Sequence, residues 1–236
     1  MTDRRPTLLL LPGLLCDKAL WASQIDALAD IADIRVADLT RDDSVAAMAR
    51  RALVDLPERF FLAGLSMGGY VALEIMATVP ARVERLALLD TSARADMPEQ
   101  VRRRQGLISL ADRGQFKGVT PRLLPMLIHT KRVEEEALTT IVTDMAERVG
   151  KDAFLRQQRA ILGRPDRRSL LPRIHVSTLV LCGAEDALTP VDLSREMAAG
   201  IATSRLTVVP DCGHLSTLER PDAVTAAMRR WLIEEF

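Results

Sequence analysis

The sequence of 236 residues is poor in cysteine and has no surplus of charge of either sign. Its three cysteines, Cys16, Cys182 and Cys212, are odd in number, widely spaced and without a C-x-x-C pair. This pattern argues against a disulfide framework and a zinc site, so we expect no metal and a reducing, cytoplasmic compartment. The 32 basic residues balance the 32 acidic ones. The charge therefore gives no reason to expect nucleic acid or an anionic membrane surface as a partner.

Long hydrophobic runs are also missing. No apolar stretch is long enough to span a membrane. The first residues, 1–6, lead into a short apolar run that ends at Pro12 and Gly13, without the length or the cleavage region of a signal peptide. We therefore expect no membrane partner. The sequence carries no signal for an oligomeric state.

Short apolar runs of strand length recur along the chain. Several are nearly continuous Leu, Val and Ile, which is typical of strands covered on both faces in a parallel sheet. The runs lie at 7–11, 31–37, 60–65, 85–89, 178–182 and 205–209, and amphipathic stretches lie between them at 18–29, 44–56, 67–79, 191–201 and 221–235. This alternation predicts an α/β fold with a mostly parallel sheet of about six strands and helices on both faces.

One segment breaks the alternation. No strand run occurs in residues 93–172, where helical patterns cover 99–110, 121–128, 134–149 and 153–162. Such a block predicts a helical cap inserted over the sheet edge where ligands bind, and a separate helical domain is the alternative. The α/β pattern resumes afterwards with too few strands to stand alone. We therefore expect one domain, with 1–92 and 173–236 as the core and 93–172 as the cap.

Ser66 lies in the pentapeptide Gly64-Leu65-Ser66-Met67-Gly68, between a strand pattern and a helix pattern. A G-x-S-x-G turn at such a junction is so tight that its flanking residues must be glycine, and it leaves the serine hydroxyl exposed at the tip. The pentapeptide also arises by chance, so its significance depends on partners elsewhere in the chain. A serine hydroxyl is a weak nucleophile unless a base takes its proton and an acid orients that base.

The candidate base is one of three histidines. His129 lies inside the helical block and His175 precedes a strand, which favours packing and surface roles for them. His214 follows the strand at 205–209 and lies in a loop beside Gly213. A histidine in a loop at a strand end, next to a glycine, is where a mobile catalytic base is expected.

The candidate acid is Asp186, which follows a strand and the turn at Gly183 and precedes a helix. Glu185 is adjacent and could be mistaken for it. Asp90 ends another strand and is the competitor, with hydrogen bonding to nearby backbone as its alternative role. We interpret Asp211 as a turn residue, because a loop neighbour rarely reaches Nδ1 of a ring that faces a serine.

The order Ser66, Asp186, His214 resembles that of the α/β-hydrolase fold family, and the chain is most similar to its small esterase-type members with a helical cap. The resemblance covers nearly the whole chain. It implies that Ser66 attacks, that His214 acts as base and then as acid, and that Asp186 orients the imidazole. No strand pattern precedes residue 7, so we expect the antiparallel hairpin that often begins this fold to be missing.

The resemblance also implies an oxyanion hole made of two backbone N–H groups. Met67, after the nucleophile, is the first donor. Leu14 is the second, with Leu15 as the fallback. Relatives often carry His-Gly before this donor, and Pro12 and Gly13 take that place here. Proline does not remove the donor, but it leaves open how the loop is braced.

Three residues are candidate substrate contacts. Leu15 belongs to an apolar loop, which argues against a strongly charged acyl group near Leu14. Met126 and Gln157 lie in the helical block. Packing in the core is the alternative role of Met126, and a place on a solvated helix face is the alternative for Gln157. A catalytic cysteine is disfavoured because Ser66 is available.

The predicted function is hydrolysis of a carboxylic ester or a related acyl bond in a small molecule, through an acyl-serine intermediate and without a metal or organic cofactor. The resemblance leaves open a thioesterase, lactonase or acyltransferase, and a lyase of the kind found in menaquinone synthesis, which uses the triad without acylation. A ligand receptor, as in plant hormone sensing, is a further alternative. The acyl chain preference is not readable, because a fold does not determine a substrate.

Overall fold

Among the residues that the structure describes, six strands form one parallel sheet in the order β2-β1-β3-β4-β5-β6. The computed structural model describes residues 5–234. The strands are β1 (Thr7–Leu11), β2 (Asp33–Val36), β3 (Phe60–Leu65), β4 (Val83–Leu89), β5 (Ser177–Gly183) and β6 (Ser204–Val209). The predicted fold class is confirmed, including the number of strands.

The burial of the strands explains their apolar sequences. Every residue of β3 is buried, as are all residues of β5 except the first. Strand β2, at one edge of the sheet, alternates between exposed and partly buried residues. A central parallel strand packs against helices on both faces, and therefore has no polar face.

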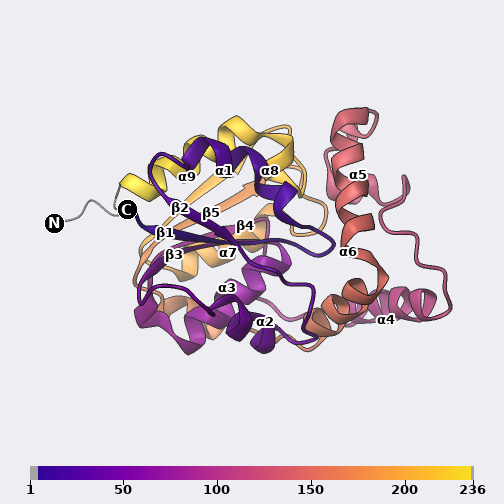
Figure 1. Ribbon diagram of the computed structural model, residues 1–236, viewed down its shortest axis with the longest axis horizontal. Helices are drawn as coiled ribbons and strands as arrows, with labels where there is room; N and C mark the ends of the chain where they lie inside the picture. Colours follow the sequence, from indigo (N-terminus) through magenta and orange to yellow (C-terminus); the bar gives the residue numbers. More distant parts are fainter. Residues whose placement is uncertain (1–4, 235–236) are drawn as a thin grey trace.

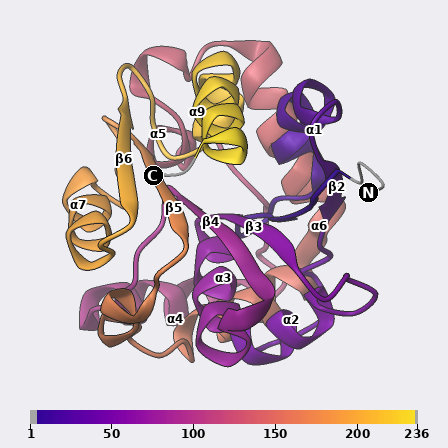
Figure 2. The same ribbon diagram turned by 90° about the vertical axis from the view of Figure 1, so that its left-hand side faces the viewer.

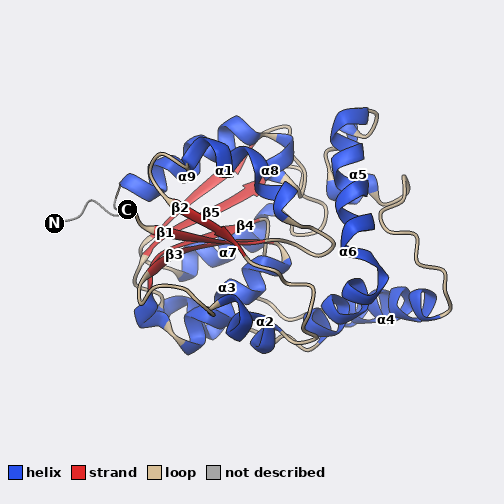
Figure 3. Ribbon diagram, viewed as in Figure 1, coloured by secondary structure: helices blue, strands red, loops and turns tan. Residues whose placement is uncertain are grey.

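Two layers of helices enclose the sheet (Figure 3). One layer packs on the face that carries Leu8 and Leu10, and the other packs on the face of Leu9 and Leu11. The first layer contains α1 (Ala22–Leu28), α8 (Ser216–Glu219) and α9 (Pro221–Ile233); the second contains α2 (Val45–Ala52), α3 (Met67–Thr78) and α7 (Val191–Gly200). The described part of the chain also contains four short 3-10 helices: η1 (Lys18–Trp21), η2 (Pro80–Arg82), η3 (Thr130–Arg132) and η4 (Arg168–Arg173).

The segment between β4 and β5 is helical and lies beyond one end of the sheet, on the right in Figure 1. It contains α4 (Pro98–Asp112), α5 (Leu124–Leu127) and α6 (Glu136–Leu162). We call residues 93–172 the cap. Figure 2, turned by 90°, shows these helices behind the sheet. The division of the chain into core and cap remains an interpretation.

Several boundaries differ from the predicted ones. The helices predicted at 134–149 and 153–162 are present as two helical stretches of α6, which meet at a kink at Gly150, where φ is 75° and ψ is 175°. Glycine adopts this conformation at little cost, so the helix resumes directly after it. The helix predicted at 121–128 shrinks to the four residues of α5. Helix α9 ends at Ile233, and residue 235 of its predicted range lies outside the described residues.

The strand order has a switch point at β1, which pairs with β2 on one side and with β3 on the other. The chain passes from β1 outward to β2 and then returns to the other side of β1 as β3. At such a switch point the two connections leave the sheet in opposite directions, which separates the loops at the carboxyl ends of the strands.

Across residues 5–234, no helix is both long and apolar enough to span a bilayer.

Leu88→Ala tests the packing of the sheet core. Leu88 is fully buried in β4, so the substitution should leave a cavity and lower the free energy of unfolding by about 3 kcal/mol. Urea denaturation measures the loss. Val54→Ala is the control, because Val54 is 63% exposed and its replacement should change the free energy by less than about 0.5 kcal/mol. Equal effects of the two substitutions would contradict this packing.

Candidate active site

Three side chains from three strand ends form one hydrogen-bonded line. Ser66 follows β3, Asp186 follows β5 and His214 follows β6. His214 Nε2 lies 2.9 Å from Ser66 Oγ, and His214 Nδ1 lies 2.8 Å from Asp186 Oδ2. His214 and Asp186 are buried, whereas Ser66 is partly exposed. The structure thus brings together the three residues selected from the sequence.

The backbone at Ser66 adopts an unusual conformation, with φ 54° and ψ −116°. A Cβ added to Gly64 would overlap the carbonyl of Gly68, and one added to Gly68 would overlap the carbonyl of Leu11. Both glycines are therefore required by close backbone approaches. The Ser66 N–H donates to Leu89 O at 3.0 Å, and Thr91 Oγ donates to Ser66 O at 2.8 Å. These bonds hold a strained residue in one orientation.

The Asp186 carboxylate is surrounded by donors. Its Oδ1 accepts from the backbone N–H groups of Leu188 (2.8 Å) and Thr189 (2.9 Å), and its Oδ2 accepts from Thr189 Oγ at 2.6 Å. Burial acts to raise the pKa of Asp186, but the His214 charge and the hydrogen bonds from His214 and Thr189 outweigh it and lower the pKa. The carboxyl is therefore ionised at neutral pH.

The loop after β1, residues 12–17, lies beside Ser66. A Cβ added to Gly13 would come within 3.5 Å of Ser66 Cβ. Leu14 is partly exposed, and its N–H donates no hydrogen bond within the described residues. The N–H of Leu15 is occupied, because it donates to Gln157 Oε1 at 3.0 Å. Met67 is the first residue of α3, so its N–H has no acceptor within the helix.

Comparison with known proteins identifies the family of the chain. The family model described as "Alpha/beta hydrolase family" matches residues 8–227. The chain belongs to the alpha/beta hydrolase family. The predicted family and the predicted class of enzyme are thereby confirmed.

Relatives of this α/β-hydrolase include a pimeloyl-[acyl-carrier protein] methyl ester esterase from Neisseria meningitidis, 31% identical over 80% of this chain and 74% of the relative. A thermophilic esterase from Thermogutta terrifontis has a similar structure, with a TM-score of 0.89 and 29% identity over 98% of this chain and 90% of that one. The structure of the enol-lactonase from Burkholderia xenovorans LB400 is also similar, with a TM-score of 0.85 and 26% identity over 98% of this chain and 93% of the enol-lactonase chain.

The imidazole of His214 in this α/β-hydrolase sits among acidic groups. Burial acts to lower the pKa of His214, but the charge and hydrogen bond of Asp186, followed by the charge of Asp90, outweigh it and raise the pKa above the ordinary 6.5. The hydrogen bond from Nδ1 to Asp186 implies that the neutral ring carries its proton on Nδ1. The lone pair of Nε2 then faces Ser66.

Glu219 holds the His214 loop against the cap. It is buried, and its carboxylate accepts the N–H of Gly213 at 2.9 Å and that of His129 at 2.7 Å. The N–H of Leu215 also donates to Leu127 O at 3.0 Å. Burial raises the pKa of Glu219, and these two N–H bonds to its carboxylate counteract the shift. Sequence reasoning missed Glu219, because its partner His129 comes from a distant segment of the chain.

The competitor acids have other partners. Asp90 is fully buried, and its Oδ1 accepts the Gly183 N–H at 2.9 Å while its Oδ2 accepts from Ser216 Oγ. Burial, together with the charge of Asp186, raises the pKa of Asp90 well above its ordinary value. Glu185 accepts the Cys212 N–H at 2.9 Å.

Several other predicted residues can now be placed. Gln157 is buried and its Nε2 donates to Leu39 O at 3.2 Å, so the alternative of a solvated helix face is wrong for this residue. Met126 is partly buried, with the Arg103 guanidinium 2.8 Å from its Sδ. Asp211 is exposed, with φ 49°, as expected of a turn residue.

The cysteines do not compete with Ser66 as nucleophiles. Burial, reinforced by the charge of Asp17, raises the pKa of Cys16 to about 12. Burial is also the main cause of the raised pKa values of the other two cysteines. The pKa of Cys182 rises to about 11, and the pKa of Cys212 rises above that of Cys182. A thiolate is therefore scarce at neutral pH. Within the described part of the chain, no group of three or more His, Cys, Asp or Glu side chains is arranged to hold a metal ion.

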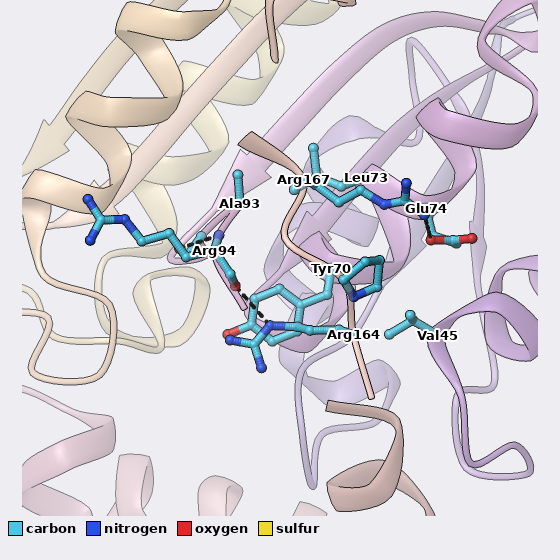
Figure 4. A pocket seen from close by; sticks show the side chains of 10 residues that line it. Val45, Tyr70, Leu73, Glu74, Ala93, Arg94, Arg164 and Arg167 are labelled. Atoms are coloured by element: carbon cyan, nitrogen blue, oxygen red, sulfur yellow. Dashed lines mark hydrogen bonds and ion pairs between the residues drawn. The ribbon is translucent and has the colours of Figure 1, made fainter. Parts of the chain in front are cut away.

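A small arginine-rich cavity lies beside α3 (Figure 4). Its volume of about 10 Å³ is room for roughly one water molecule. The Arg164 guanidinium stacks 4.1 Å from the centre of the Tyr70 ring and pairs with Asp96 at 2.8 Å. The other two arginines pair with glutamates, Arg94 with Glu196 at 2.8 Å and Arg167 with Glu74. The cavity is therefore part of a structural ion-pair cluster.

Asp90→Asn tests the buried carboxyl. In the variant, Oδ1 still accepts from Gly183 and Nδ2 can donate to Ser216 Oγ. The pKa of Asp90 is higher in the folded protein than in the unfolded chain. The contribution of Asp90 to the stability of the folded state is therefore complete at pH values below its unfolded pKa, and it is lost as the pH rises through its folded pKa. The free energy of unfolding of the variant minus that of the wild type should therefore increase by about 1 kcal/mol or more between pH 4 and pH 8.

Urea denaturation at several pH values measures this difference. Asp192→Asn is the matched control, because Asp192 is exposed and its replacement should move the difference by less than about 0.5 kcal/mol. A flat difference for Asp90→Asn would show that this carboxyl does not carry a raised pKa.

Proposed function

We propose that this α/β-hydrolase cleaves a carboxylic ester or a similar acyl bond through an acyl-serine intermediate. The observation that carries the proposal is the continuous line from Asp186 through His214 to Ser66, with distances of 2.8 and 2.9 Å. A partly exposed hydroxyl in such a line is an activated nucleophile.

In the first step, Ser66 Oγ bonds to the acyl carbon and passes its proton to His214 Nε2. Asp186 accepts the Nδ1–H bond, keeps Nε2 free to act as the base, and stabilises the imidazolium. The oxyanion accepts from the N–H groups of Met67 and Leu14. The N-terminus of α3 adds a partial positive charge beside it.

In the second step, the carbonyl re-forms and the bond to the alcohol breaks, while His214 Nε2–H protonates the leaving oxygen. Water then attacks the acyl-serine, gives a proton to His214 and releases the carboxylic acid as Ser66 recovers its proton. No step needs a metal or an organic cofactor.

The relatives support this class of substrate. The named methyl ester esterase and enol-lactonase both act on an acyl carbon bonded to oxygen. The enol-lactonase makes lactone hydrolysis the second candidate, since the same steps open a ring when the leaving alcohol remains attached. The apolar loop at Leu14 and Leu15 favours an uncharged acyl group of a small molecule. The three free cysteines further support a cytoplasmic location.

Ser66→Ala should lower ester hydrolysis by about 10⁴-fold or more, since the base then has no nucleophile to activate. The measurement is a series of p-nitrophenyl esters of increasing acyl length, with a fluorophosphonate probe to detect acylation. Ser204→Ala is the control and should retain activity, because Ser204 lies at the amino end of β6.

Other outcomes would favour the alternative functions. Turnover without serine labelling would favour the lyase, and tight ligand binding without turnover would favour the receptor. Transfer of the acyl group to a thiol or alcohol would identify an acyltransferase, and a preference for thioesters over esters would identify a thioesterase.

The pH dependence of kcat/KM should show His214 acting as a base. Activity should rise with pH through the pKa of His214 in the free enzyme and then level off, with a midpoint above 6.5 because Asp186 raises that pKa. Asp186→Asn should lower kcat by about 10⁴-fold, since the ring loses its orienting acceptor. A midpoint well below 6.5 in the wild type would contradict this role of Asp186.

A further inference from the structure

The loop after β1 is attached to the cap by a buried hydrogen bond. Gln157 lies in the second half of α6 and is 1% exposed. Its Oε1 accepts from the Leu15 N–H at 3.0 Å, and its Nε2 donates to Leu39 O at 3.2 Å. Both polar ends of the side chain are therefore used by backbone groups of the core, so the Gln157 amide is committed to holding the loop.

Two further contacts attach the same loop to the cap. The Leu15 side chain packs in an apolar cluster with Ala146 and Phe154 of α6. Asp17, which caps η1 through the Ala19 N–H at 2.8 Å, accepts from Arg148 Nε of α6 at 2.6 Å. The cap thus holds the loop through a polar bond, an apolar contact and an ion pair.

Leu15 needs this support, because its φ of 58° lies in the left-handed region. A leucine there is disfavoured by roughly 1–2 kcal/mol, and such a residue persists only where its surroundings hold it. Leu15 directly follows Leu14, the candidate oxyanion donor. Holding the Leu15 N–H fixes the peptide that joins the two residues. This restricts the backbone torsion angles of Leu14, whose own N–H belongs to the adjacent peptide, between Gly13 and Leu14.

We propose that Gln157 is a positioning residue of the oxyanion hole. It fixes the Leu14–Leu15 backbone so that the Leu14 N–H faces the developing oxyanion, and it makes the hole dependent on the place of α6. The cap therefore contributes to transition-state stabilisation as well as covering the site. This inference also accounts for the bracing of a loop that has Pro12 before Gly13. It rests on the proposed function, because an oxyanion forms only if Ser66 attacks an acyl carbon.

Gln157→Met tests the proposal, since methionine has a similar size and cannot accept the Leu15 N–H bond in the same way. Gln158→Met is the matched control. Gln158 is equally buried, but it bonds within the cap, accepting from Arg104 Nη1 of α4 at 2.9 Å. A misplaced donor weakens the transition state more than the bound ester. Gln157→Met should therefore lower kcat by about 10- to 100-fold with KM within about threefold, and Gln158→Met should leave kcat within about threefold.

A second measurement separates the oxyanion hole from general damage. A trifluoromethyl ketone of the preferred acyl chain adds to Ser66 and places an oxyanion in the hole, whereas the corresponding methyl ketone remains trigonal. Gln157→Met should weaken binding of the trifluoromethyl ketone by the same factor as kcat and leave that of the methyl ketone unchanged. The proposal is overturned if kcat matches that of Gln158→Met, if the loss lies in KM, or if both ketones weaken equally.

Gln157→Glu keeps the test decisive if the methionine variant does not fold. A protonated glutamate can accept from Leu15 and donate to Leu39 O as glutamine does. An ionised one still accepts from Leu15 but cannot donate to Leu39 O, so the end of the side chain that faces Leu39 is no longer held. The kcat of this variant relative to the wild type should fall as pH rises, and a constant ratio below one would overturn the proposal. Fluorophosphonate labelling of wild-type Ser66 is done first. Its absence counts against the proposed function, whereas labelling combined with a negative Gln157 result counts against this inference alone.

Discussion

The close backbone contact between β1 and the first turn of α3 is the constraint on which the site depends. Gly68 lies against the carbonyl of Leu11, and Gly64 lies against Gly68, with no room for a Cβ at either glycine. This packing places the turn at Ser66 beside the loop after β1, where a Cβ added to Gly13 would lie 3.5 Å from Ser66 Cβ. Because the strand order reverses at β1, the connections after β1 and β3 leave the sheet toward opposite faces, and ligands bind at such a point in open α/β sheets. The candidate nucleophile and both candidate oxyanion donors therefore share one arrangement of backbone.

The cap is joined to this arrangement at two places by buried polar groups. Gln157 of α6 holds the loop after β1, and Glu219 holds His129 of the cap against the loop of His214. A buried polar group is costly when it lacks a partner, so each of these contacts favours one placement of the cap over others. Residues 93–172 are thus hydrogen-bonded to both the loop after β1 and the loop of His214. The ion pair between Arg148 and Asp17 supports the same placement.

Much of the fold could be predicted from the sequence, because its signals are local. A buried parallel strand is apolar along its whole length, so β3 and β5 were visible as continuous runs. The glycines around Ser66 and the glycine beside His214 indicated turns at strand ends. Boundaries were less predictable. The kink at Gly150 interrupts the helical geometry for one residue, and whether a helix resumes after such a residue depends on what the next turn packs against.

The sequence by itself determined the type of sheet, the helical block between β4 and β5, and the choice of Ser66, Asp186 and His214 as candidates. It favoured Asp186 over Asp90 but could not show which of the two carboxyls reaches His214, since both follow strands that end at the same edge of the sheet. Only the tertiary structure decided that Asp186 meets His214 while Asp90 bonds to Gly183 and Ser216. It alone revealed how Gln157 braces a loop more than a hundred residues away. Hydrogen bonds between distant segments leave no periodic pattern in a sequence, because they depend on the packing of whole elements.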